Sequence, residues 1–176
     1  PPREQEPPTT VDWQTDVFRV LKSAGVRHVV YVPDAGHSTA IRLAETDNEI
    51  NAVVLTTEEE GIGYLAGAWL GGERGALLMQ SSGVGNCVNM LSMIQECRFP
   101  LLTIVTMRGQ WGEANPWQVP MGQATRTVLE AVGVRCFPVE RAEEIGEVFA
   151  AAADIAFNST VSAAVLVSQR VIGAKG

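Results

Sequence analysis

The chain has 176 residues, 46% of them hydrophobic, and this length and composition predict one domain with a sizeable core. Twenty acidic residues outnumber 13 lysines and arginines, and the resulting net charge of −7 argues against a nucleic-acid partner, because binding the phosphate backbone needs clustered cations. No apolar run reaches the length of a membrane span and no signal-peptide pattern appears, so we expect a cytoplasmic protein without a membrane partner.

Residues 1–10 are rich in proline and polar side chains and contain little that could be buried. We therefore expect a mobile leader over residues 1–10 and a single domain over residues 11–176. Apolar side chains at helical spacing then predict a helix over Val11–Ala24, and Gly25 marks its end.

The segment His28–Pro33 has the composition of a first core strand, and the turn after it leads into a helix from about His37 or Ser38. Loops at the carboxyl ends of parallel strands bind ligands in open α/β sheets. Asp34 and His37 are therefore candidate site residues. Each has a purely structural alternative, because an aspartate after proline commonly forms a turn and a histidine at a helix start can simply be solvated.

The run Asn51–Thr56 is apolar and β-branched enough for a buried strand, and Thr57 followed by three glutamates, Glu58–Glu60, is typical of a helix start. The helix continues through the small residues of Gly61–Ala68, which allow another backbone to approach closely, and it ends at Gly71–Gly72. Taken alone, three glutamates at this position would indicate a solvated face that complements the helix dipole.

A second apolar strand, Gly75–Gln80, precedes Ser81–Asn86, a segment predicted to be a turn that exposes backbone N–H groups at the start of the next helix. An ordinary strand-to-helix turn also needs glycines. The further predicted helices are Val88–Cys97, Ala124–Val132 and Ala142–Phe157, and the further strands are Pro100–Thr106, Val134–Pro138 and Ala163–Ser168. This alternation predicts an α/β fold, a three-layer α/β/α arrangement with a six-stranded parallel sheet and right-handed crossovers.

The connection Met107–Pro120 is long for a loop in a compact domain. Loops of this length are usually functional or disordered, and the tryptophans Trp111 and Trp117 argue against disorder. The loop is predicted to be either an interface or packing loop, or a substrate loop. Arg108 follows a predicted core strand and is a candidate for pairing with an anionic substrate, although a surface salt bridge would also explain it.

The three cysteines, Cys87, Cys97 and Cys136, cannot all pair within one chain and show no C-x-x-C spacing. They predict neither a disulfide framework nor a zinc site. We interpret them as small, buried hydrophobic residues.

Four motifs occur together: T-T-E-E-E-G-I-G-Y-L-A-G-A from residue 56, L-M-Q-S-S-G-V-G-N from residue 78, M-R-G at residues 107–109 and Q-V-P-M-G at residues 118–122. Their combination resembles the pyrimidine-binding domain of thiamine-diphosphate-dependent decarboxylases, especially those that act on sulfopyruvate and phosphonopyruvate. The resemblance extends over most of Val29–Val134. The resemblance implies a thiamine-diphosphate-binding fold and a lyase that decarboxylates a small anionic 2-oxo acid.

In the resembled family, a glutamate hydrogen-bonds N1′ of the aminopyrimidine and promotes the imino tautomer that deprotonates C2 of the thiazolium. Aligning the glycine of the small-residue helix with Gly67 selects Glu58 for this role, with Glu59 as the alternative one residue away. The S-G-x-G segment would lie against the aminopyrimidine. The further cofactor-binding residues that the resemblance implies are Ser82, Gly83, Gly85 and Asn86.

The candidate substrate-facing residues are Asp34, His37, Arg108 and Gln118. In the family, the loop after the first strand faces the thiazolium and the substrate. Where several relatives carry Asp or Ser in that loop, this sequence has Ala35, so no proton-transfer role is inferred there.

The family holds the cofactor diphosphate through Mg²⁺, bound by a G-D-G motif and a later asparagine pair, and this sequence contains no G-D-G. The resemblance therefore implies a hetero-oligomer in which a separate β subunit supplies the diphosphate-binding domain and the Mg²⁺ ligands. One alternative is a non-catalytic subunit or scaffold that keeps the fold and binds a partner chain. Another is an unrelated nucleotide-binding domain, against which the absence of G-x-G-x-x-G after the first strand argues.

Overall fold

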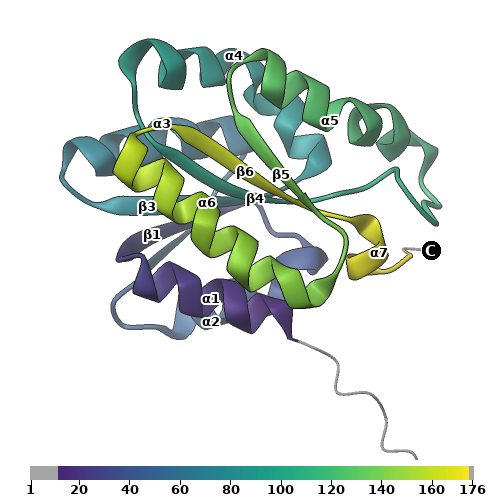
Figure 1. Ribbon diagram of the computed structural model, residues 1–176, viewed down its shortest axis with the longest axis horizontal. Coiled ribbons are helices and arrows are strands. Elements are labelled where there is room, and N and C mark those ends of the chain that lie inside the picture. The colour runs from purple at the N-terminus through teal and green to yellow at the C-terminus, as the bar shows by residue number, and fades with distance from the viewer. Residues whose placement is uncertain (1–11, 175–176) are drawn as a thin grey trace, which may run out of the picture.

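A computed structural model describes residues 12–174, so the expected leader over residues 1–10 lies outside the described part of the chain. Six parallel strands form one sheet in the order β2-β1-β3-β4-β6-β5, with helices on both faces (Figure 1). The predicted three-layer α/β/α fold is confirmed. The strands are β1 (Val26–Tyr31), β2 (Asn51–Val54), β3 (Arg74–Gln80), β4 (Leu101–Thr106), β5 (Arg135–Val139) and β6 (Ser162–Val167). The helices are α1 (Trp13–Ser23), α2 (Ser38–Thr46), α3 (Glu58–Leu70), α4 (Ser81–Cys97), α5 (Val119–Ala131), α6 (Ile145–Ser159) and α7 (Gln169–Ile172), with short 3₁₀ turns at Ala35–His37, Pro116–Gln118 and Ala142–Glu144.

Different helices cover the two faces of the sheet (Figure 1). On one face, α1, α2 and α6 pack through side chains such as Val17 and Phe149. On the other face, α3, α4 and α5 pack through side chains such as Ile62 and Leu91. Because helices cover both faces, strands β4 and β6 are buried along their whole length, which explains their continuous apolar sequences.

β2 lies at the edge of the sheet and pairs only with β1. Its residues are exposed or half-buried, and Val54 is 62% exposed. The prediction of a buried strand in Asn51–Thr56 is therefore wrong about burial, although a strand does form there. An apolar, β-branched run does not reveal whether a strand has neighbours on both sides.

The segment Ser81–Asn86 is helical, so the prediction of a turn there is wrong. α4 begins directly after β3, and Ser81 is its first residue. Gly83 is required for steric space and not for a turn, because a Cβ atom at this position would lie 2.4 Å from Cδ of Glu58. The glycine in this motif thus reflects close contact with α3.

The other predicted elements are confirmed to within a few residues, except that α4 begins at Ser81 instead of Val88 and α5 begins at Val119 instead of Ala124. Pro120 occupies the first turn of α5, where a helix tolerates proline because the N–H groups there have no intrahelical partner. None of the helices between residues 12 and 174 is both long and apolar enough to cross a bilayer.

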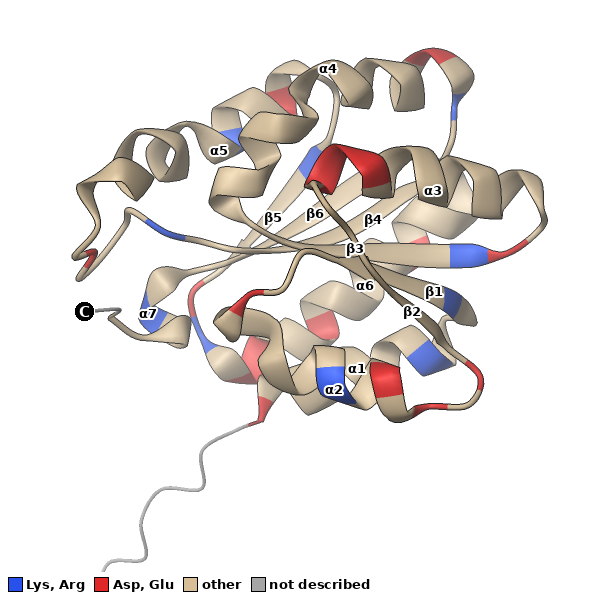
Figure 2. Cartoon of the chain, turned by 180° about the vertical axis from the view of Figure 1, so that it is seen from behind, with Lys and Arg blue, Asp and Glu red and all other residues tan. Residues whose placement is uncertain are grey.

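The carboxyl ends of all six strands lie along one edge of the sheet, because every strand pair is parallel. β1 lies between β2 and β3, so the connections after β1 and β3 run to opposite sides of the sheet, and the crevice between these strands is a topological switch point. Figure 2 shows the acidic first turn of α3 directly after β2, near the start of α4. Most of the predicted site residues lie at this edge.

Candidate functional site

Glu58 is the first residue of α3, and it points into the protein instead of into solvent. Its residue exposure is only 7%. The Nδ2 of Asn86 donates a hydrogen bond of 2.9 Å to Glu58 Oε2, and Gly83 leaves the space that the carboxylate fills. Three of the predicted cofactor-binding residues, from two helices, therefore meet at one point.

The other two glutamates of the triplet lie in different surroundings. Glu59 is exposed. Glu60 accepts a 2.9 Å hydrogen bond from the backbone N–H of Thr56, which caps the start of α3. Successive helical residues point about 100° apart, so only one of the three can face α4. The geometry supports Glu58, and not Glu59, as the glutamate that faces the site.

A second group of polar side chains joins the ends of β1, β3 and β4. Asp34 Oδ1 accepts from Gln80 Nε2 at 3.2 Å, and Asp34 Oδ2 accepts from Thr106 Oγ1 at 2.8 Å. The Ser82 hydroxyl in turn donates to Gln80 Oε1 at 2.7 Å. Asp34 and Ser82, which are far apart in the sequence, are thus linked through Gln80 at the switch point.

Sequence reasoning did not single out Gln80 or Thr106. Each is the last residue of its strand and directly follows apolar residues. A polar residue in that position was the available signal, because it marks the carboxyl edge where parallel sheets place their sites.

His37 lies beneath this edge instead of on it. Its exposure is 0%, and its Nε2 is 3.2 Å from the carbonyl oxygen of Met79. The ring also makes an edge contact with Trp13, at 6.3 Å between centroids. The structure therefore does not present the His37 ring to a ligand in solvent.

Arg108 follows β4 as predicted, and its guanidinium is engaged inside the chain. Nε and Nη2 each donate to the carboxylate of Glu113 at 2.6 Å, with side-chain exposures of 12% for Arg108 and 4% for Glu113. This forked contact is the main cause that lowers the pKa of Glu113 to about 2, and it raises the pKa of Arg108. The alternative of a salt bridge applies, but the bridge is buried.

Gln169 is a further residue that the sequence did not indicate. It is fully buried, its Nε2 donates to Glu113 at 3.0 Å, and its Oε1 accepts from the backbone N–H groups of Gln110 and Trp111. It thereby fixes the loop after β4 to the end of β6. A glutamine at the start of a short helix carries no local signal for such a role, because its partners lie far away in the sequence.

The two ends of the loop over residues 109–119 touch each other. A Cβ on Gly109, which has φ +71°, would lie 2.6 Å from Cα of Val119 and 2.7 Å from the carbonyl oxygen of Gln118. Both ends and the centre are therefore tied, which defines an Ω-loop. Gln118 is half-buried at its end, and its Oε1 has no hydrogen-bond partner among residues 12–174.

The Glu58 site fits the pyrimidine of thiamine diphosphate on the evidence of its donors and acceptors. Among the described residues, Asn86 is the one hydrogen-bond partner of the Glu58 carboxylate, which leaves acceptor capacity for a ring nitrogen. For a metal ion the residues do not converge: within residues 12–174, no group of three or more His, Cys, Asp or Glu is placed to hold one.

Comparisons with known proteins agree with this geometry. Residues 12–124 match the family described as thiamine pyrophosphate enzyme, N-terminal TPP binding domain. The chain is 36% identical over 151 residues to the sulfopyruvate decarboxylase subunit alpha of Methanococcus maripaludis, covering 85% of this chain and 90% of that protein. It is 37% identical over 161 residues to the protein of the same name from Methanothermobacter thermautotrophicus, covering 89% and 95%.

More distant matches are longer proteins. The phosphonopyruvate decarboxylase of Streptomyces viridochromogenes is 35% identical over 117 residues, which cover 65% of this chain but 30% of that protein. A solved 2-oxoglutarate:ferredoxin oxidoreductase from Magnetococcus marinus shares the fold, with a TM-score of 0.75 and 14% identity over 91% of this chain and 29% of its own. The family match, the identities over most of the chain and the shared fold together show that the chain belongs to the thiamine pyrophosphate enzymes, as their N-terminal TPP-binding domain.

Proposed function

We propose that the chain is the α subunit of a heteromeric, thiamine-diphosphate-dependent decarboxylase that acts on a small anionic 2-oxo acid of the sulfopyruvate or phosphonopyruvate type. The observation that carries the proposal is the buried Glu58 carboxylate, held between Gly83 and Asn86 in a domain of the matching family. The decarboxylase names of the relatives favour this proposal over a non-catalytic scaffold.

When bound, thiamine diphosphate supplies the electron sink for decarboxylation. Glu58 holds a proton between its carboxyl group and N1′ of the aminopyrimidine. Asn86 orients the carboxyl by donating to Oε2, so that Oε1 is the oxygen left for N1′. Gly83 leaves room for the Glu58 carboxylate in this position, because any larger residue would occupy the same space.

The proposal includes a partner chain. The sequence has no G-D-G motif, and the described residues contain no cluster suited to a metal. We therefore assign the diphosphate and the Mg²⁺ ligands to a β subunit that docks at the carboxyl edge of the sheet. The subunit names of the relatives support such a partner.

The contacts support the four proposed substrate-facing residues to different degrees. Asp34 lies at the switch point with its carboxylate held by Gln80 and Thr106, a suitable place for a group that faces a substrate. Gln118 has an unsatisfied amide oxygen near the same edge. Arg108 and His37 are already engaged by other groups, so a contact with substrate would require them to rearrange.

The test compares Glu58→Gln with Glu59→Gln in the complex reconstituted with the chain that carries the diphosphate-binding domain. The measurement is proton–deuterium exchange at C2 of the bound cofactor, followed by NMR after acid quenching. Glu58→Gln should slow exchange by about 10²–10⁴-fold, the usual contribution of a general acid–base group, and the exposed Glu59→Gln should not. Parental exchange in Glu58→Gln would refute the assigned role.

A further inference from the structure

A second cleft, of about 540 Å³, opens at the carboxyl ends of β4, β5 and β6. Its volume is in the range of small-molecule sites. Glu58, Gly83 and Asn86 do not line this cleft. The two sites are close neighbours, because a Cβ on Gly85 would lie 3.1 Å from Sδ of Met121, which precedes the lining residue Gly122.

One wall of this cleft includes an aromatic side chain on an anchored backbone. Trp111 lines the cleft and is 50% exposed. Its backbone N–H donates at 3.0 Å to Oε1 of the fully buried Gln169, which also donates to Glu113. The backbone that carries the indole is thus held by a buried side chain, so a flat ring can stack on the indole without first ordering the loop.

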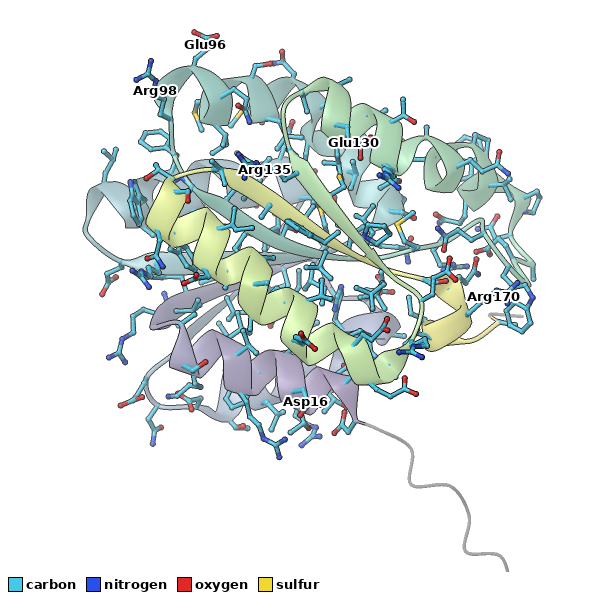
Figure 3. The ribbon with its side chains drawn as sticks, viewed as in Figure 1. Asp16, Glu96, Arg98, Glu130, Arg135 and Arg170 are labelled. Atoms are coloured by element: carbon cyan, nitrogen blue, oxygen red, sulfur yellow. The ribbon has the colours of Figure 1, made fainter. Side chains whose placement is uncertain are left out.

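Two arginines line the cleft from different helices. Arg170 projects from α7, at the end of the molecule opposite Glu96 and Arg98 (Figure 3). Its guanidinium makes no ion pair or hydrogen bond with any residue between 12 and 174. Arg126, on α5, pairs with Glu130, but both side chains are about half exposed and such surface pairs are weak. In a chain with a net charge of −7, two cations at one cleft favour an anionic ligand.

The cleft also contains a carboxylate. Glu140, directly after β5, lines it and has no ion pair or hydrogen bond from its side chain within the described part of the chain. A carboxylate repels a bare phosphate ion but accepts hydrogen bonds from ligand hydroxyl groups, as acidic residues do from ribose in other α/β folds. A flat surface, a hydroxyl acceptor and two guanidinium groups match the three parts of a nucleotide.

We propose that this cleft binds a nucleoside phosphate, with the base on Trp111, the ribose hydroxyls at Glu140 and the phosphates between Arg126 and Arg170. The proposal does not depend on the proposed decarboxylase activity. Arg108 connects the two regions, because its backbone N–H donates to Ser81 Oγ at the start of α4 while its side chain holds Glu113.

The test is calorimetric titration of the full chain with ADP, adenosine and inorganic phosphate. ADP should bind more tightly than either of the other two, because adenosine lacks the phosphates and inorganic phosphate lacks the base and the ribose. Arg170→Ala and Trp111→Phe should each weaken ADP binding by about tenfold, the usual effect of losing one charged hydrogen bond or one stacking contact. Fluorescence of the parental chain should be quenched by ADP, and less so in Trp111→Phe.

Matched controls separate this site from general charge attraction and from the cofactor site. Arg42→Ala removes an exposed arginine on α2, Trp117→Phe changes the exposed tryptophan that does not line the cleft, and Glu58→Gln changes the other site. All three should bind ADP like the parental chain. The proposal is overturned if ADP does not bind at millimolar concentration, if Arg170→Ala and Trp111→Phe both bind it normally, or if Arg42→Ala weakens binding equally.

Discussion

Glu58 and Glu113 are two buried carboxylates at the same edge of the sheet, and they differ in the hydrogen bonds that they accept. Glu113 accepts five, two from Arg108 and the others from Gly109, Asn115 and Gln169. Glu58 accepts one from the described residues, that of Asn86. Burying a carboxylate is unfavourable unless its oxygens are satisfied. The unfilled capacity at Glu58 is therefore suited to a ligand, and the saturated Glu113 is suited to holding a loop.

The same contrast explains why Arg108 differs from its expected role. A strand-end arginine suggested an anion site, and the structure shows that the anion is the Glu113 carboxylate of its own loop. The sequence separation between the two is short, but helix spacing or strand alternation could not indicate the pair, because the loop has no regular period. To predict Glu113 as the partner of Arg108, one would have to know that the loop folds back on itself.

The largest expected effect after that of Glu58→Gln is at Gly83. Gly83→Ala would place a Cβ 2.4 Å from Glu58 Cδ, and the glutamate side chain, being flexible, should swing away while the fold survives. We expect C2 exchange in the complex to slow by about 10²-fold or more, because the carboxyl leaves N1′. The double variant with Glu58→Gln should be no slower than Glu58→Gln alone, and additive losses would show that Gly83 acts by another route.

At the second carboxylate, the expected effect is on stability. Glu113→Gln leaves the Arg108 guanidinium without its anionic partner and should lower the free energy of unfolding by about 2–3 kcal/mol. Urea denaturation of the isolated chain measures this change. Glu130→Gln, which removes an exposed ion pair, is the matched control and should change stability little. Equal effects of the two variants would contradict a structural role for Glu113.

The pH dependence of stability offers an independent check on Glu113. In the folded chain its pKa is lowered from 4.5 to about 2, chiefly by Arg108. A lowered pKa means that folding favours the charged form, so the stabilisation is complete above the ordinary pKa and is lost as pH falls from about 4.5 towards 2. The difference in Tm between the parental chain and Glu113→Gln should shrink over that range. A difference that stays constant on acidification would count against the assignment.

A smaller effect is expected from Gln169→Ala, which removes the amide that holds the backbone of Gln110 and Trp111. We expect a loss of about 1–2 kcal/mol in stability, together with a change in tryptophan emission as the loop loosens. Gln123→Ala, at an exposed glutamine on α5, should change neither. Unchanged emission in Gln169→Ala would mean that the loop does not need this anchor.

The sequence by itself determined the order and type of the elements, because each depends on local composition. Continuous apolar runs such as Leu101–Thr106 and Ser162–Val167 can be buried only in a parallel sheet with helices on both faces. The start of α3 at a run of glutamates could likewise be predicted from the sequence, because helix N-termini favour acidic residues whatever their surroundings.

Only the tertiary structure decided which residues meet. It places β2 at an edge, selects Glu58 from its triplet through the space left by Gly83, and pairs Glu113 with Arg108 and Gln169. Burial and hydrogen bonding at these positions depend on neighbours contributed by other strands and helices, which periodicity along one segment does not contain. A local pattern therefore predicts which helix or strand carries a side chain. The packing of distant segments determines whether that side chain has a partner within the chain or is left available for a ligand.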